Sequence, residues 1–374
     1  MPDRTYLRWL LGVISLGLIM IAGFNLAADS YILRHRNGAS VQLMSGFERV
    51  LKPAWLESVQ PSVVFVGSSR VRQGFDPVLV KQALGLTSFN YGVSTITAYE
   101  TRRLIQDAAA QLSVRMLVVS LDSFTRGNAA QPFVPGFEET RLAVTADGRP
   151  TKNRTIWLNL ARALSGGALS MHALSVSALL RLEPDQAAAD RPDIFGSYSR
   201  MTNQTYRDEI GKRAHRSMQL SDWQRGQLRA ALAAICARPI EVLLFFPPDN
   251  FAMTNIFMAN DADGMIAFKR QIVDDVADSN TNCQSRIRLF DFMYLTAMSG
   301  DVPAARDSAY YVDLVHFRAP LGTQMLQWML APTKQTAGPW EGVELTGDRA
   351  AAAAAAAQIE RLRSDVLRWR ALPH

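Results

Sequence analysis

The chain alternates short apolar runs with helical patterns, and this alternation constrains its fold more than any other feature. Apolar runs rich in β-branched or aromatic residues occur at 63–66, 88–91 and 116–121, with helical patterns at about 78–85 and 97–112. Short strands that alternate with longer helices are typical of βα units. The pattern therefore predicts an α/β fold, with a mostly parallel sheet between two layers of helices.

The same alternation returns in the second half of the chain. Ser221-Asp222-Trp223-Gln224 has the form of a capping box and opens a helix that we expect to reach about residue 237. Strands are expected at 240–246 and 287–290, with one helix over about 261–280 and another after Pro320. These elements complete the predicted sheet.

Residues of about 123–220 interrupt the pattern, with many Gly, Pro, Asn and Asp residues and one expected helix at about 155–182. A structureless loop of this length is uncommon in a compact domain. We interpret the segment as an inserted cap beside the active site, rather than as a second domain with its own core. The expected domain then covers residues 61–331.

Segments of different composition flank this domain on both sides. We expect an N-terminal anchor at 1–30, linkers at 31–60 and 332–347, and an alanine-rich amphipathic helix at 348–374. A narrow apolar stripe continues that last helix at spacings of three and four, through Ile359, Leu362, Val366 and Trp369. The stripe can dock on the domain, on a partner helix or at a membrane surface.

Trp9 to Ala28 is a run of 20 residues without a charge, which is the length of a membrane-spanning helix. A cleaved signal peptide is the alternative, but its apolar core is usually shorter and ends in a small-x-small site. Leu26-Ala27-Ala28 matches such a site poorly, so we favour an uncleaved anchor. Arginines lie on both sides of the run and do not decide its orientation.

Composition describes a globular chain, with 48% hydrophobic and 20% charged residues and a net charge of +6. No continuous basic run or basic-aromatic interleaving indicates nucleic-acid binding. No cluster of His, Cys or carboxylate residues has metal-ligand spacing, and no glycine-rich phosphate loop is present. We therefore expect no metal, no cofactor and no nucleic-acid partner.

The first predicted strand runs directly into Gly67-Ser68-Ser69, and α/β folds place ligands and nucleophiles just beyond the carboxyl ends of strands. A serine hydroxyl needs a neighbouring base to become a nucleophile. Three histidines lie away from the anchor and the C-terminus, and among them only His316 follows an acid, Asp313, by three residues. Serine, histidine and aspartate together are the parts of a catalytic triad, although His316 can also be read as a structural loop residue.

The block Gly67-Ser68-Ser69-Arg70, followed by Gly74-Phe75-Asp76-Pro77 and the late Asp313-x-x-His316, resembles the SGNH/GDSL hydrolase superfamily. It looks most like the membrane-anchored bacterial branch that includes alginate O-acetylation proteins and the protein of teichoic-acid D-alanylation. The resemblance covers about residues 60–330 and implies a three-layer flavodoxin-like fold. It also implies that Ser69, rather than Ser68, is the nucleophile, with Asp313 and His316 as its partners.

The resemblance further implies an oxyanion hole, built from the backbone N–H groups of Ser69 and Gly92. The superfamily's third donor is an Asn after the third strand, but Asp122 stands in that place here. An ionised carboxylate cannot donate a hydrogen bond. Asn128 can substitute only if its loop folds back toward the nucleophile.

Other polar residues are expected at the same edge of the sheet. Arg70 can bind an anionic substrate or pair with Asp76 or Asp122, and Asp122 can shape the pocket. Asp249 and Asn250 follow the strand at 240–246 and are candidates for substrate contact, although a Pro-Pro turn also requires polar residues.

Cys236 and Cys283 each lie just before a predicted strand. If those strands are parallel neighbours, both cysteines lie at the same edge of the sheet, and a disulfide is geometrically possible. An oxidising compartment would permit the bond. Two free buried thiols are the alternative.

The resemblance implies an acyltransferase or esterase, with acetyl as the expected group, that acts on a cell-envelope or secreted polysaccharide. It implies a single-pass protein of the bacterial inner membrane with its domain in the periplasm. A multi-spanning membrane acyltransferase or a polysaccharide synthase complex is the expected partner. The alternatives are a plain exported esterase or lipase, and a catalytically silent SGNH fold that binds polysaccharide or acts as a scaffold.

Overall fold

The computed structural model describes residues 4–34, 48–151, 219–249, 251–293, 310–312, 315–331 and 343–344. The chain divides into two compact units. One unit contains residues 1–55 and 138–194, and the other contains residues 56–137 and 195–374. The predicted helices at 155–182 and 348–374 lie outside the described residues.

The first unit contains the N-terminal helix α1 (Arg4–Arg34). Its segment Arg4–Gly23 is 20 residues long, has a mean hydropathy of 1.8 and contains no buried residue. This length and composition suit a membrane span, and a signal sequence has the same properties. The unit also contains η3 (Glu139–Arg141) and the start of α3 (Glu48–Val59).

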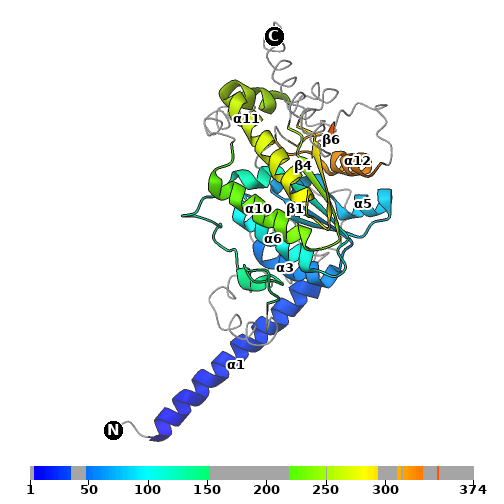
Figure 1. Ribbon diagram of the computed structural model, residues 1–374. Coiled ribbons are helices and arrows are strands. Elements are labelled where there is room, and N and C mark those ends of the chain that lie inside the picture. The colour runs from blue at the N-terminus through cyan, green and yellow to red at the C-terminus, as the bar shows by residue number, and fades with distance from the viewer. Residues whose placement is uncertain are drawn as a thin grey trace. The chain divides into compact units, whose positions relative to one another are not determined.

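The second unit is built on a sheet whose first five strands are all parallel (Figure 1). The strands are β1 (Val63–Gly67), β2 (Ser88–Gly92), β3 (Met116–Ser120), β4 (Glu241–Phe246) and β5 (Arg286–Asp291). The α/β class and the five predicted strands are confirmed. A two-residue strand, β6 (Val343–Glu344), pairs antiparallel with β5 and was not predicted.

The spatial order of the strands is β2-β1-β3-β4-β5-β6. The chain therefore passes from β1 to β2 on one side, and then returns to place β3 on the other side of β1. In open α/β sheets this reversal leaves a crevice at the carboxyl ends of the two central strands, where ligands usually bind. Here those ends belong to β1 and β3.

Helices cover both faces of the sheet (Figure 1). One face carries α4 (Ser69–Gly74), α5 (Pro77–Leu84) and α12 (Ala319–Leu330), which share a buried apolar cluster with the strands. The other face carries α6 (Ala98–Ala110), α10 (Asp222–Cys236) and α11 (Phe251–Asn280). Because both faces are covered, consecutive strand residues are all buried, which explains the continuous apolar runs in the sequence.

Three local predictions differ from the structure. The short helix α4 was not predicted, although Ser68 caps its start. Helix α6 ends at Ala110 rather than at the predicted residue 112, so Leu112 lies beyond the helix and is 83% exposed. Helix α11 begins ten residues earlier than expected and is interrupted at Asp261, whose backbone is not helical.

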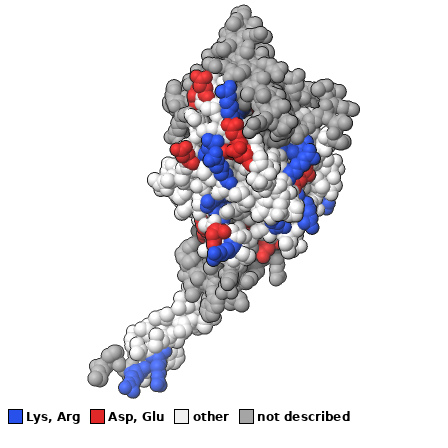
Figure 2. All heavy atoms as spheres, viewed as in Figure 1, with Lys and Arg blue, Asp and Glu red and all other residues white. Residues whose placement is uncertain are grey.

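The described part of the predicted insert contains only short elements, η2 (Leu121–Thr125) and η3, before α10 begins. Basic and acidic side chains are interspersed over the face shown in Figure 2. On this face the described residues therefore form no large patch of one charge.

Candidate active site

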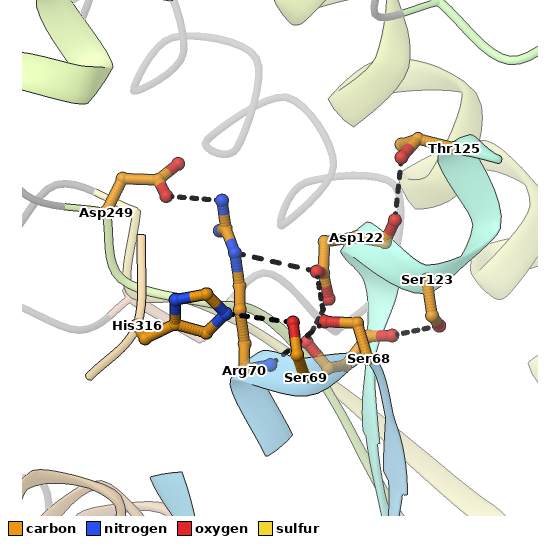
Figure 3. Close-up of polar contacts among 9 residues, drawn as sticks. Ser68, Ser69, Arg70, Asp122, Ser123, Thr125, Asp249 and His316 are labelled. Atoms are coloured by element: carbon orange, nitrogen blue, oxygen red, sulfur yellow. Dashed lines mark hydrogen bonds and ion pairs between the residues drawn. The ribbon is translucent and has the colours of Figure 1, made fainter. Parts of the chain in front are cut away.

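Ser69 and His316 are far apart in sequence and meet beyond the carboxyl end of β1 (Figure 3). The Oγ atom of Ser69 lies 2.9 Å from Nε2 of His316. Ser69 is the first residue of α4 and is half-buried, while His316 is 8% exposed. When the imidazole carries its proton on Nδ1, Nε2 accepts the hydroxyl hydrogen, which is the arrangement that a general base needs.

A narrow turn of the backbone holds His316 in place. Tyr311 and Phe317 form an antiparallel bridge, and the Val312 N–H donates to the His316 carbonyl at 2.8 Å. The Phe317 side chain is completely buried and meets the Phe75 ring edge-on, with 5.9 Å between the ring centroids. The imidazole is thus fixed by a residue that belongs to the apolar core.

Two glycines allow this turn to approach α4. A Cβ atom on Gly74 would lie 1.9 Å from the Phe317 ring, and one on Gly322 would lie 1.7 Å from the Gly74 carbonyl oxygen. Real side-chain atoms do not approach so closely. The contact between α4 and α12, and with it the position of His316, therefore requires glycine at both places.

Ser68 has a different environment from its neighbour Ser69. Its Oγ donates to Oδ2 of Asp122 at 2.7 Å and accepts from the Arg70 N–H at 3.2 Å. The second contact caps the start of α4. Both contacts hold the backbone in place, so the geometry favours Ser69 over Ser68 as the reactive hydroxyl.

Asp122 lies in η2, directly after β3, and acts as an acceptor for groups on both central strands. Its Oδ1 accepts from Ser120 Oγ at 2.6 Å, and its Oδ2 accepts from Ser68. The Nε atom of Arg70 is 3.6 Å from the same Oδ2. Asp122 therefore ties the ends of β1 and β3 together, and its carboxylate oxygens act as acceptors there.

Arg70 connects Asp122 to Asp249, which follows β4 (Figure 3). Its Nη2 lies 2.7 Å from Oδ1 of Asp249, an ion pair that is close in distance but poorly aligned as a hydrogen bond. The Arg70 side chain is 12% exposed and that of Asp249 is 1% exposed. Of the two predicted partners of Arg70, the structure pairs it with Asp122, while Asp76 caps α5 through the Val78 N–H.

Burial raises the pKa of Asp249 to about 6. The positive charge of Arg70 opposes this shift, and the negative charge of Asp122 adds to it. Lys269, on α11, also lowers the pKa of the carboxyl group. Asp249 therefore changes its charge within the pH range in which many enzymes operate.

A second buried pair extends this row of charges, and sequence reasoning missed it. Lys269 is completely buried, and its Nζ lies 2.6 Å from Oδ2 of Asp291 at the end of β5. The ammonium group also lies 5.4 Å from the centre of the Phe246 ring. The signal available in the sequence was Asp291, which directly follows the strand expected at 287–290.

The amide of Gly92, a predicted oxyanion donor, is engaged by a neighbouring side chain in this structure. Its N–H donates to Oδ1 of Asn90 at 2.9 Å, and a Cβ atom at this position would lie 2.3 Å from the Arg72 nitrogen. The Asn90 amide in turn donates to carbonyls at the end of α4, those of Val71, Arg72 and Phe75. Gly92 and Asn90 therefore hold α4 against β2, and a role of the Gly92 amide as an oxyanion donor stays a prediction that would require this bond to open.

Asn128 also has a local role. Its side-chain oxygen accepts the N–H groups of Ala130 and Gln131 at 3.0 and 2.9 Å, so it closes a turn. Asp313 and Asn250, two further predicted site residues, lie outside the described residues. The backbone N–H of Ser69 stays a predicted oxyanion donor.

Cys236 and Cys283 are joined in a disulfide at the opposite edge of the sheet, before β4 and β5. The register of these strands, with Glu241 opposite Arg286, explains why the two cysteines come together. Over the ranges that the structure describes, no group of three His, Cys, Asp or Glu residues is arranged to hold a metal ion.

Comparison with protein-family models and with curated proteins found no match for this chain. The site contains a half-buried serine hydroxyl within hydrogen-bond distance of a histidine, at the point where the strand order of the α/β sheet reverses. Beside this pair, Arg70 lies between the carboxylates of Asp122 and Asp249.

Proposed function

We propose that the chain is an exported SGNH-like serine enzyme that transfers or removes an acyl group, with acetyl expected, on a cell-envelope or secreted polysaccharide. The contact of Ser69 with His316, at the carboxyl end of β1, carries this proposal. A serine and a histidine at this distance form the central pair of a nucleophilic triad.

In the proposed reaction, Ser69 Oγ attacks the carbonyl carbon of an acyl donor while His316 Nε2 takes the hydroxyl proton. His316 then gives this proton to the leaving oxygen, and the acyl group stays on Ser69 as an ester. Water or a sugar hydroxyl next attacks that ester, and its proton returns through His316 to Ser69. Asp313 would orient the imidazole and stabilise its charged form.

The SGNH assignment rests on the resemblance of the 67–70 and 313–316 blocks to that superfamily. The flavodoxin-like strand order 2-1-3-4-5 supports it as a matter of topology. The placement in the bacterial inner membrane, with the domain in the periplasm, is supported by the apolar segment of α1 and by the disulfide. A multi-spanning acyltransferase or a polysaccharide synthase remains the proposed partner.

A catalytically silent SGNH fold, which binds polysaccharide or acts as a scaffold, is the second candidate. Asp122 favours it, because a carboxylate at the end of β3 opposes an oxyanion that forms nearby. The engaged N–H of Gly92 favours it further.

Labelling of Ser69 tests the two candidates. The full chain in detergent would be treated with a fluorophosphonate probe and assayed with p-nitrophenyl acetate. We expect labelling and hydrolysis in the wild-type protein and in Ser62→Ala, and neither in Ser69→Ala. Ser62 is a matched control because it flanks the opposite end of β1, where its hydroxyl donates to the Thr87 carbonyl at 2.9 Å. Absence of both signals from the wild-type protein would leave the silent fold as the better description.

The choice between esterase and transferase needs a second assay. A polysaccharide acceptor is added to the chain with p-nitrophenyl acetate as donor. Transfer predicts acetyl esters on the polysaccharide that are absent from Ser69→Ala. A simple esterase releases only acetate.

A further inference from the structure

A cluster of aromatic rings lies on the surface of the sheet-bearing unit. The rings of Tyr99, Phe133 and Phe137 pack against one another, with centroids 6.1 to 6.4 Å apart. Phe133 is 44% exposed. Only two other large hydrophobic residues are exposed in the described part of this unit, Val78 and Leu112, and neither belongs to such a cluster.

Arg102 completes this surface, and we call the four residues Tyr99, Arg102, Phe133 and Phe137 the aromatic platform. The guanidinium carbon of Arg102 lies 4.8 Å from the centre of the Tyr99 ring. Its Nε is inaccessible to solvent and has no hydrogen-bond acceptor. Among the described residues, none supplies Arg102 with a carboxylate partner.

The Arg102 guanidinium is partly withdrawn from water, and its Nε has no hydrogen-bond acceptor among the described residues. Burial lowers the pKa of Arg102, which shows that its charge is partly removed from water. A desolvated cation is normally paired with an anion, because an unpaired one loses its hydration and gains little in return. The ring of Tyr99 compensates part of this loss by a cation–π contact. A carboxylate bound at the outer nitrogens of the Arg102 guanidinium would add a charge-assisted contact that the ring does not supply.

The platform is held in a fixed shape by Glu100, which is 1% exposed. Its Oε2 accepts the Thr97 N–H at 3.1 Å and its Oε1 accepts the Val134 N–H at 2.9 Å. One carboxylate thus joins the start of α6 to the segment that carries both phenylalanines. A preorganised surface binds its ligand with a smaller loss of conformational entropy than a flexible one.

The platform also lies at the reactive edge of the sheet. Helix α6 starts at Ala98, shortly after the carboxyl end of β2, and Tyr99 and Arg102 belong to its first turns. The segment with Phe133 and Phe137 follows η2, which begins at the carboxyl end of β3 and carries Asp122. Both segments that carry the platform therefore begin at the carboxyl edge of the sheet, where Ser69 also lies.

We infer that the aromatic platform binds an acidic sugar, a pyranose ring that bears a carboxylate, within a polysaccharide chain. The apolar C–H face of the ring would cover Phe133 and its neighbours, which removes exposed aromatic surface from water. The carboxylate would pair with the planar guanidinium of Arg102, whose donors match two carboxylate oxygens. As a subsite for substrate, this platform depends on the proposed function, whereas the binding itself does not depend on Ser69.

Calorimetric titration of the full chain in detergent, in a Ser69→Ala background, tests binding without turnover. The probes are oligogalacturonate and oligoglucuronate, and the methyl ester of each serves as a neutral counterpart with the same ring. We expect at least one acid form to bind and its ester to bind about tenfold more weakly or worse. Arg102→Gln should weaken binding of the acid form by about tenfold or more, and Phe133→Ala by about three- to tenfold.

Arg115→Gln and Leu112→Ala are the matched controls, because both residues are exposed and lie at the opposite edge of the sheet, beyond α6 and before β3. Both controls should bind like the parent chain, and thermal unfolding should show all four variants folded. The proposal is overturned if neither acid binds, if acid and ester bind equally, or if the two platform variants bind like the controls. It is also overturned if Arg102 and Phe133 are needed for binding anionic phospholipid vesicles and not for binding either acid. Loss of Ser69 labelling in the earlier assay would reject the serine chemistry and leave this titration unaffected.

Discussion

The two edges of the parallel sheet use different chemistry. At the carboxyl edge, Ser69, Asp122 and Asp291 lie at or just beyond the ends of strands. Two largely buried cations, Arg70 and Lys269, pair with carboxylates at the same edge. At the amino edge, a disulfide joins the segments before β4 and β5, and polar groups such as Ser285 bond to nearby carbonyls. Buried ion pairs add little net stability because their desolvation offsets their attraction, whereas a disulfide stabilises the fold by constraining the unfolded chain.

This contrast predicts how substitutions at the two edges should behave. Changes to the reactive pair and to the buried charges at the carboxyl edge should alter activity or pH dependence, whereas a capping residue there, such as Ser68, should affect mainly stability. Changes at the amino edge should lower stability and leave the reaction unchanged. A substitution that crosses this division would show that the edges are coupled.

His316→Gln should have the largest effect. It removes the base from Ser69 and should lower kcat for p-nitrophenyl acetate by about 10⁴-fold or more, if the proposed chemistry holds. The midpoint of thermal unfolding should change little, because the backbone bonds of the turn do not need the imidazole. The double variant Ser69→Ala/His316→Gln should be no slower than Ser69→Ala, since the two residues act as a unit. Additive losses would contradict a shared step.

The sequence predicted the five parallel strands because burial on both faces produces an apolar run that is visible without any tertiary information. The short helix α4 escaped detection because six residues do not establish a helical period. The end of α6 was placed too far along the chain, since Leu112 fits the helical spacing but lies beyond the last turn.

The site residues that are marked by a local sequence pattern could be predicted. Ser69 and His316 each follow recognisable local patterns, and the structure brings them together. The pairing of Arg70 with Asp249 was not predictable, since it depends on which strands lie side by side and how far their ends project. The engagement of the Gly92 amide by Asn90 was missed for a similar reason, because it requires the close approach of α4 to β2.

Removal of the disulfide should have the next largest effect. The bond closes a segment with a sequence separation of 47 residues, for which loss of loop-closure entropy in the unfolded chain suggests about 4 kcal/mol. Cys236→Ala/Cys283→Ala should therefore lower the free energy of unfolding by about that amount in urea titrations, while kcat at 25 °C stays the same. A large loss of kcat in a variant that is still folded would show that the amino edge controls the site.

Asp249→Asn should change how stability depends on pH. In the folded protein the pKa of Asp249 is raised from 3.8 to about 6, so folding favours the protonated acid. This contribution to stability is complete below about pH 4 and is lost as pH rises through about 6, a decrease of roughly 3 kcal/mol. Asn cannot titrate, and the variant should show a flatter dependence of the free energy of unfolding between pH 4 and 7.

Asp76→Asn is the control for this measurement, because Asn replaces Asp well as a helix cap. It should retain the pH dependence of the parent chain. Equal slopes in the parent and in Asp249→Asn would mean that Arg70 keeps the buried carboxyl ionised throughout this range.

Ser68→Ala should have the smallest effect and separates the two neighbouring serines. Loss of the helix cap and of the hydrogen bond to Asp122 should lower the free energy of unfolding by about 1 kcal/mol. Labelling of Ser69 by the fluorophosphonate probe should persist, because the contact between Ser69 and His316 does not involve the Ser68 side chain. The opposite pattern, with labelling lost in Ser68→Ala and retained in Ser69→Ala, would transfer the nucleophile to Ser68. In that case Asp122, and not His316, would be the acceptor of its proton.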